Sequence, residues 1–217
     1  MKAYKPDGSL YGKVLFRGLP EMIAQFATPV TTICLNHVLI QKLGDLGVNV
    51  FAIISYVASF MSVLFGASEG LQPLFGQSYG AKEEKDLRYY LRSGMVICFA
   101  GSALCVLISV VFARPIGALF GAEGEVLDFT VTYMPQYAWA FIIAGFNTLI
   151  SAYLYSTKRS VHAIILNVAR SFVINILVIV GLSALAGADI VWFTFGISEC
   201  AVLVIAFLLK QMSEKTE

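Results

Sequence analysis

The sequence predicts an all-α membrane protein, a bundle of six transmembrane helices, and this prediction rests on composition and on the spacing of charged residues. Of the 217 residues, 58% are hydrophobic and only 13% are charged, and the mean hydropathy is +0.78. Soluble domains contain about 45–50% apolar and about 25% charged residues. Charge is almost absent from six long stretches, each near the roughly 20 residues with which a helix crosses the core of a bilayer.

The six predicted spans follow one another with short polar connections between them. They cover residues 22–41, 46–68, 93–113, 129–157, 171–188 and 190–209, and Glu199 alone interrupts the last of them. The first residues are polar and contain no apolar core ahead of a cleavage site, so they do not resemble a signal peptide. We therefore expect a cytoplasmic linker at 1–13, a six-helix transmembrane lobe at 14–211 and a cytoplasmic tail at 212–217.

Positive charges collect in alternate connections, which predicts the orientation in the membrane. The cations before span one, between spans two and three, between four and five and after six are Lys2, Lys5, Lys13, Arg17, Lys82, Lys85, Arg88, Arg92, Lys158, Arg159, Lys210 and Lys215. The other connections hold only Lys42 and Arg114 as cations, beside several acidic residues. By the positive-inside rule both termini are cytoplasmic, as an even number of spans requires. The net charge of +1 predicts no nucleic-acid partner.

The first span carries an ordered polar face. At about 100° per residue, its members fall within an arc of roughly 80°; they are Glu21, Gln25, Thr28, Thr32 and Asn36. In lipid such a face must turn toward protein or water. One interpretation is a packing seam, in which Thr hydroxyls bond to their own helix and Asn36 bridges to a neighbour. The other interpretation, which we prefer, is the wall of a substrate or ion cavity.

Three ionisable residues lie near mid-membrane depth in the predicted spans: Glu69, Arg170 and Glu199. Each would cost about 2.5–3.5 kcal/mol if a helix exposed it at the bilayer centre, so all three should face the protein interior. We hypothesise that Arg170 neutralises one carboxylate and leaves the other free to hold a proton for coupling. The alternative is a static pair of Arg170 and Glu199 that only fixes helix packing.

Small residues form a stripe along the second span. Spacings of three and four keep them on one helix face together with Glu69, the one charged exception, and they are Ser55, Ser59, Ser62, Gly66, Pro73 and Gly76. Such stripes let a neighbouring backbone approach closely, so the pattern predicts tight helix contact. All four cysteines also fall inside predicted spans, without the C-x-x-C spacing of metal or redox sites, and are expected to be packing residues.

Three sequence motifs in order resemble the C-terminal lobe of multidrug and toxic compound extrusion (MATE) transporters. Residues 70–82, GLQPLFGQSYGAK, resemble the motif that ends the second helix of that lobe. The run Gly18-Leu19-Pro20, with Asn36 further on, resembles its opening helix, and residues 187–199 resemble its last helices. The resemblance covers nearly the whole chain, and bacterial multidrug exporters are the nearest branch.

The resemblance implies secondary active efflux of amphipathic or cationic small molecules across the plasma membrane. Sodium ions or protons would drive the antiport, with no further cofactor and no enzymatic activity. The candidates for coupling to the cation are Glu21, Gln25, Glu69, Arg170 and Glu199. The candidates for lining the cavity or binding substrate are Phe26, Thr28, Thr32, Asn36, Tyr56, Met61, Gln72, Asn167 and Asn175. The sequence has no G-x-x-x-x-G-K-[ST] nucleotide loop, which agrees with transport without ATP.

Two departures from the family pattern bear on function. Many relatives carry a Glu where this chain has Gln25, and an amide cannot supply that charge; Glu21, one turn earlier, could substitute or could instead pair with Arg17. The family also folds as two six-helix lobes, of which this chain resembles the second. The expected partners are therefore a drug-like small molecule, the lipid bilayer, and a missing N-terminal lobe or a second copy of this chain, unless the chain is a fragment of a longer exporter.

Two further functions stay open at this point. A lipid or oligosaccharide flippase of the same superfamily would keep the fold and change the cargo, and would favour a more basic cavity. An intramembrane serine hydrolase is suggested by the G-x-S-x-G pattern at residues 66–70, with His37 and His162 as possible bases. A nucleophile elbow requires a strand, a sharp turn and a helix, whereas Ser68 lies in a predicted helix.

Overall fold

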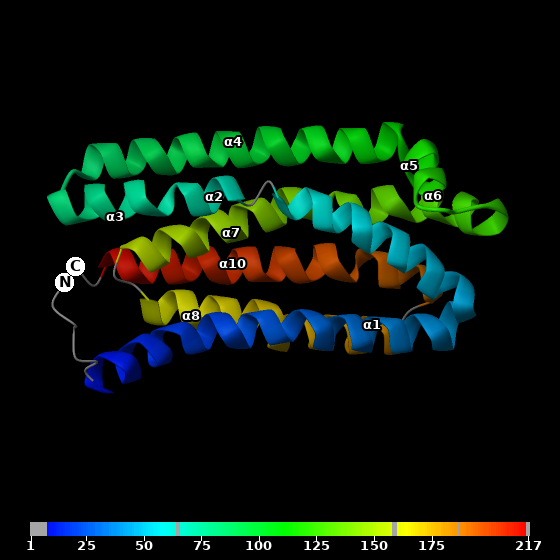
Figure 1. Cartoon of the computed structure of the whole chain (residues 1–217), viewed down its shortest axis with the longest axis horizontal. Coiled ribbons are helices and arrows are strands. Elements are labelled where there is room, and N and C mark those ends of the chain that lie inside the picture. The colour runs from blue at the N-terminus through cyan, green and yellow to red at the C-terminus, as the bar shows by residue number, and fades with distance from the viewer. Residues whose placement is uncertain (1–7, 64–65, 158–159, 186, 216–217) are drawn as a thin grey trace, which may run out of the picture.

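The computed structural model describes residues 8–63, 66–157, 160–185 and 187–215, and their regular structure is helical throughout (Figure 1). The elements are α1 (Gly8–Ser62), α2 (Gly66–Gly70), α3 (Gln72–Ala81), α4 (Glu84–Val111), α5 (Ala113–Leu119), α6 (Gly124–Ala138), α7 (Ala140–Ser156), α8 (Ser160–Val168), the π-helix η2 (Ala169–Ile174), α9 (Asn175–Leu185), the 3-10 helix η3 (Ala188–Phe193) and α10 (Thr194–Lys215). The predicted all-α class is confirmed.

Five apolar helical stretches in the described residues are long enough to cross a membrane. They are Pro29–Ala81, Glu84–Val111, Gly124–Ser156, Ile164–Leu185 and Asp189–Leu208. The first of them is 53 residues long and reverses direction at Gly44, whose φ of 62° and ψ of −154° lie in a region almost restricted to glycine. Figure 1 shows α1 running along the bundle, turning, and returning toward α2. The doubled first stretch and the other four correspond to the six predicted spans.

The connections predicted to share one side of the membrane do lie at one end of the bundle. In Figure 1 the start of α1, the turn between α3 and α4, the facing ends of α7 and α8, and the end of α10 lie together on the left. The bend in α1, the short helix α5 and the start of α6 lie on the right. That the cation-rich end faces the cytoplasm remains a prediction.

Helix α7 occupies the middle of the bundle and packs against both α4 and α10. One apolar cluster surrounds Leu149 on α7, where Gly94 of α4 permits close contact: a Cβ at Gly94 would lie 2.9 Å from Leu149 Cδ1. A second cluster includes Tyr133, which stacks on Trp192 with 4.7 Å between ring centroids and donates a hydrogen bond of 2.6 Å to Asp189 Oδ1. These clusters fix α7 and α10 beside the pocket described next.

The stripe of small residues in the second span does not pack as predicted. Ser59, Ser62 and Gly66 are exposed, and the two hydroxyls bond back to carbonyls of their own helix, Ser55 O and Ser59 O. A Cβ at Gly66 would meet no atom within 4 Å, and one at Gly76 only Ser156 O at 3.9 Å. The prediction of tight helix contact is therefore wrong for Ser59, Ser62 and Gly66, whose positions on α1 and α2 are exposed in this chain.

Candidate functional site

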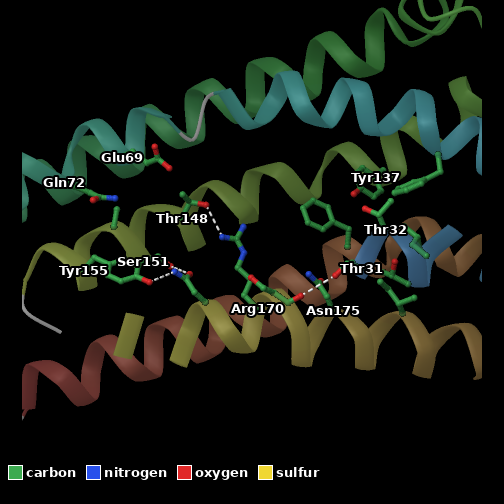
Figure 2. A pocket seen from close by; sticks show the side chains of 18 residues that line it. Thr31, Thr32, Glu69, Gln72, Tyr137, Thr148, Ser151, Tyr155, Arg170 and Asn175 are labelled. Atoms are coloured by element: carbon green, nitrogen blue, oxygen red, sulfur yellow. Dashed lines mark hydrogen bonds between the residues drawn. The ribbon is translucent and has the colours of Figure 1, made fainter. Parts of the chain in front are cut away.

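A pocket of about 380 Å³ lies between the helices of the bundle. Side chains from α1 on both sides of its bend at Gly44, from α2 and α3, and from α6, α7, α8, η2, α9 and α10 line it, so that most of the bundle contributes (Figure 2). Its polar lining residues are Thr31, Thr32, Glu69, Gln72, Tyr137, Thr148, Ser151, Tyr155, Asn167, Arg170, Ser171, Asn175 and Thr194. In an apolar bundle, such a concentration of polar groups is the default place to look for function.

Arg170 lines the pocket and is held by an ion pair with Glu199. Arg170 Nε donates to Glu199 Oε1 over 2.9 Å, and the exposed fractions of the two side chains are 19% and 2%. Asn147, on α7, donates from Nδ2 to Glu199 Oε2 over 2.7 Å and to the Glu199 carbonyl oxygen over 2.9 Å. Both carboxylate oxygens are thus occupied, and the negative charge of Glu199 offsets the positive charge of Arg170.

Glu69 faces the same pocket without such a partner. It lies on α2, its side chain is exposed, and it makes no hydrogen bond or ion pair with any residue that the structure describes. Figure 2 shows Glu69 on one side of the pocket and Arg170 on the other, with Thr148 between them. The structure therefore separates the two carboxylates: Glu199 is paired and buried, and Glu69 is unpaired and accessible.

A π-helix presents Arg170 to the pocket. The six residues of η2, Ala169–Ile174, interrupt the α-helical ladder between α8 and α9. Wider turns of this kind are rare and often occur at functional sites. Within η2, the carbonyl oxygen of Ser171 accepts a hydrogen bond of 3.4 Å from Thr31 Oγ1 on α1. The irregular segment thus ties α1 to the element that carries the guanidinium.

A short chain of hydrogen bonds extends the polar wall beyond Arg170. Ser151 Oγ donates to Asn167 Oδ1 over 3.1 Å, and Asn167 Nδ2 donates to the hydroxyl oxygen of Tyr155 over 3.1 Å. Ser151 and Tyr155 belong to α7 and Asn167 to α8, so these bonds join two helices along the pocket (Figure 2).

The other part of the pocket is aromatic. Tyr137 stacks on Phe195 with 5.0 Å between ring centroids and an interplanar angle of 16°, and it meets Phe51 edge-on at 6.3 Å. Figure 2 shows Tyr137 at the opposite end of the pocket from Tyr155. The site therefore offers a polar, ionisable part and an aromatic part to one occupant.

Comparison with known proteins decides the family. The MatE family model matches residues 20–181 of the chain, which is well over half of its length. The chain belongs to the MATE family. Protein DETOXIFICATION 34 of Arabidopsis thaliana is 30% identical to it over 107 residues, which are 46% of this chain and 20% of that relative.

Solved MATE structures share the fold over the whole chain. An outward-facing multidrug resistance MATE family transporter of the MOP superfamily matches 100% of the chain with a TM-score of 0.88 and 20% identity. An inward-facing one matches 98% of the chain with a TM-score of 0.87 and 19% identity. The chain covers 49% and 50% of those two proteins, so it corresponds to about one lobe of a MATE transporter. The predicted family and fold are confirmed.

Several residues predicted for the site do line the pocket of this MATE lobe. They are Thr32, Glu69, Gln72, Asn167, Arg170 and Asn175. Glu199 lies behind Arg170 and holds it in place. For Glu21, Gln25 and Thr28 the helix α1 is described, but their side chains lie outside the described part of the structure.

Four other candidates do not line the pocket. Met61 is 4% exposed and belongs to the apolar core, Tyr56 stacks on Phe120, and Phe26 is exposed on α1. Asn36 is partly buried, and its Oδ1 has no partner among the described residues. An apolar or aromatic side chain carries little sequence signal for direction in a membrane, because lipid and protein core are equally apolar.

Sequence reasoning missed the contribution of α7. Thr148, Ser151 and Tyr155 line the pocket at spacings of three and four, and Asn147 fixes Glu199 from the same helix. A helical projection of residues 129–157, of the kind made for the first span, would have placed the first three on one face. Asn147, four residues before Ser151, would have fallen at the edge of the same face, but its partner Glu199 would not have been evident.

Proposed function

We propose that this chain is one lobe of a secondary active exporter that moves amphipathic, cationic small molecules across the plasma membrane. Inward movement of sodium ions or protons, exchanged for the cargo, drives the export. The observation that carries the proposal is the unpaired carboxylate of Glu69 in a pocket where Glu199 already offsets the charge of Arg170. Such a pocket bears net negative charge and attracts cations.

The size and lining of the pocket support an amphipathic cargo. Its volume of about 380 Å³ falls within the roughly 300–1,000 Å³ typical of small-molecule sites. The stacked rings of Tyr137 and Phe195 can hold the apolar part of a cargo, while Glu69 holds its positive charge. Aromatic faces also attract organic cations directly.

Antiport follows if cargo and coupling ion compete for one carboxylate. A sodium ion or a proton on Glu69 removes the charge that holds the cargo, and cargo on Glu69 excludes the ion. Among the other coupling candidates, Glu199 is occupied by Arg170 and Asn147. Glu21 and Gln25 remain sequence predictions, as does the division into linker 1–13, lobe 14–211 and tail 212–217.

A second lobe completes the transporter in this proposal. The chain covers about half of the solved structures that it matches. Glu69 lines the pocket and is exposed in this lobe, so a second lobe can cover this side of the pocket. The second lobe is another copy of this chain, a separate N-terminal lobe, or the rest of a longer protein. The mass of the native protein in mild detergent distinguishes these from a lone species of 23.6 kDa.

The pocket gives less support to the two alternatives. A flippase for lipids or oligosaccharides with anionic groups requires positive potential, but Glu199 offsets Arg170 and Glu69 adds negative charge. A serine hydrolase requires an exposed nucleophile beside a base. Ser68 is buried in α2, its hydroxyl lies 3.2 Å from Cys98 Sγ, and the described residues contain no strand for a nucleophile elbow.

Transport by membrane vesicles tests the proposal. With an imposed sodium or proton gradient, vesicles that contain the native protein should move a fluorescent organic cation, and Glu69→Gln should lower the gradient-driven rate at least about tenfold. The amide keeps the size of the side chain and removes the charge that binds either cation, a loss on the scale of one charge-assisted hydrogen bond or more.

Glu123→Gln is the matched control, because Glu123 is exposed, caps α6 without a side-chain hydrogen bond and lies outside the pocket. It should leave the transport rate unchanged. Equal gradient-driven rates in the Glu69→Gln and control proteins would contradict the role of Glu69.

A further inference from the structure

Arg170 has hydrogen-bond donors that no residue described in the structure accepts. A guanidinium carries five N–H groups in a rigid plane. Nε is taken by Glu199 Oε1 and Nη1 donates to Thr148 Oγ1 over 3.2 Å, whereas Nη2 has no partner among the described residues. Arg170 nevertheless lines the pocket, with 19% of its side chain exposed. The guanidinium that lines the space proposed for cargo therefore carries donors without partners among the described residues.

Asn147 explains why the ion pair is incomplete. Arg and a carboxylate often pair through two parallel hydrogen bonds, which here would join Nε and Nη2 to the two oxygens of Glu199. Asn147 Nδ2 instead occupies Glu199 Oε2 at 2.7 Å. A second bond from Nδ2 to the Glu199 carbonyl oxygen at 2.9 Å fixes the amide, since an amide oxygen turned to this side would face two acceptors. Asn147 thus keeps Nη2 of Arg170 available.

We propose that Nη2 of Arg170 is a second recognition point, and that the preferred cargo is an organic cation that also carries a neutral hydrogen-bond acceptor such as an amide carbonyl. The cationic centre binds at Glu69 and the acceptor binds at Arg170, across the same pocket (Figure 2). Asn147 is the positioning residue that maintains this donor. The inference rests on the proposed function, because it assigns this pocket to cargo.

A neutral acceptor fits this point better than an anionic one. Glu199 already offsets the charge of Arg170 at 2.9 Å, and Glu69 faces the same pocket. A carboxylate on the cargo would therefore be repelled by two negative charges, Glu69 and Glu199, and attracted by only one positive charge, Arg170. A carbonyl oxygen gains the charge-assisted hydrogen bond without that repulsion.

Two matched probes test the inference on the purified protein in mild detergent. Benzyltrimethylammonium provides the cation alone, and its 4-carbamoyl derivative adds an amide of no net charge. Isothermal titration or displacement of a fluorescent cation measures both affinities. The unaltered protein should bind the carbamoyl derivative about tenfold more tightly, the value of one hydrogen bond to a charged group. Equal affinities would overturn the inference.

Substitutions locate the effect. Arg170→Lys keeps a cation for Glu199 but removes the planar donors, and Asn147→Leu frees Glu199 Oε2 to take Nη2. Each should bring the ratio of the two affinities from about ten toward one. Asn49→Leu changes an exposed asparagine outside the pocket and should keep the ratio. A ratio that stays near ten in both Arg170→Lys and Asn147→Leu would also overturn the inference.

Glu69→Gln separates this inference from the proposed function. If the pocket holds the cation at Glu69, this variant weakens both probes and preserves the preference for the carbamoyl derivative. If it weakens neither, or if the unaltered protein binds neither probe, the proposed function fails and the inference fails with it. If it weakens both while the unaltered protein shows no preference, only the role of Arg170 is overturned.

Discussion

The buried ion pair of Arg170 and Glu199 shows how partners offset the free-energy cost of burying a charged residue in this bundle. The Glu199 side chain is 2% exposed and would be strongly disfavoured as a lone charge in such surroundings. Two partners, Arg170 and Asn147, compensate for the lost solvent. The pair need not stabilise the fold relative to apolar residues, but removal of one member leaves the other uncompensated.

A double-mutant cycle on this pair has a defined expectation. Glu199→Met should destabilise the protein by about 3–5 kcal/mol, because it leaves the Arg170 charge partly buried without its partner. Arg170→Met should have a similar effect through Glu199. The double variant should lose clearly less than the sum of the two. Urea or thermal unfolding in mild detergent measures these differences, and simple additivity would show that the pair does not couple.

The sequence could predict that Glu69, Arg170 and Glu199 face the interior, because charge is expensive in lipid. It could not predict which carboxylate pairs with Arg170. That choice depends on Asn147, a neutral residue on α7 that completes the coordination of Glu199. The free state of Glu69 is therefore a consequence of tertiary contacts and not of the residue's own position in a span.

Among the helices, α10 packs closely against the junction of α6 and α7 at Gly196. Trp139 separates those two helices, and its ring lies against Gly196 of α10: a Cβ added there would lie 2.1 Å from Trp139 Cζ2. Gly196 thus permits the approach that brings Phe195 and Glu199 to the pocket side of α10. A larger residue must displace either the ring or the helix.

Two identical substitutions in different helices test this packing. Gly196→Ala should destabilise the protein by about 1–3 kcal/mol, the usual cost of overpacking. Gly181→Ala, inside α9, meets no atom within 4 Å and should be neutral or stabilising by up to about 1 kcal/mol, because alanine favours the helix. Thermal unfolding of the two variants side by side gives the comparison. Equal shifts would show that the contact with Trp139 does not constrain α10.

Span positions could be predicted well because absence of charge is a strong signal over 20 residues. The reversal at Gly44 falls in the connection predicted at residues 42–45. The π-helix η2 could not be predicted, since residue types do not distinguish a π-helix from an α-helix and its wider turn depends on contacts such as that between Thr31 and Ser171. The helix contact predicted for the small residues around Ser59 and Gly66 was wrong, because the spacing of small residues does not determine which surface lies opposite them.

For the whole molecule, the lobe is the unit of structure. It matches solved MATE transporters in outward-facing and inward-facing conformations equally well, with TM-scores of 0.88 and 0.87. This agrees with a general pattern in secondary transporters, in which alternating access is largely a rigid-body movement of one bundle against the other. Under the proposed export, the pocket in this lobe would keep its internal contacts while the opening beside Glu69 changes.

Export through this lobe requires a pocket that is open to water and ions. In a protein whose four cysteines, Cys34, Cys98, Cys105 and Cys200, are replaced by serine or alanine, Gln72→Cys places a thiol in the pocket lining. Leu177→Cys is the control, since Leu177 is 66% exposed on α9 but does not line the pocket. The reagent is 2-(trimethylammonium)ethyl methanethiosulfonate, a cation that does not cross lipid, applied to membranes.

Gln72→Cys should react with this reagent, and benzyltrimethylammonium should slow the reaction by occupying the pocket. Leu177→Cys should react far more slowly, with no protection. If Gln72→Cys reacts no faster than Leu177→Cys, the polar groups around Glu69 and Arg170 lie in closed packing, and the proposed role of this pocket in export is contradicted.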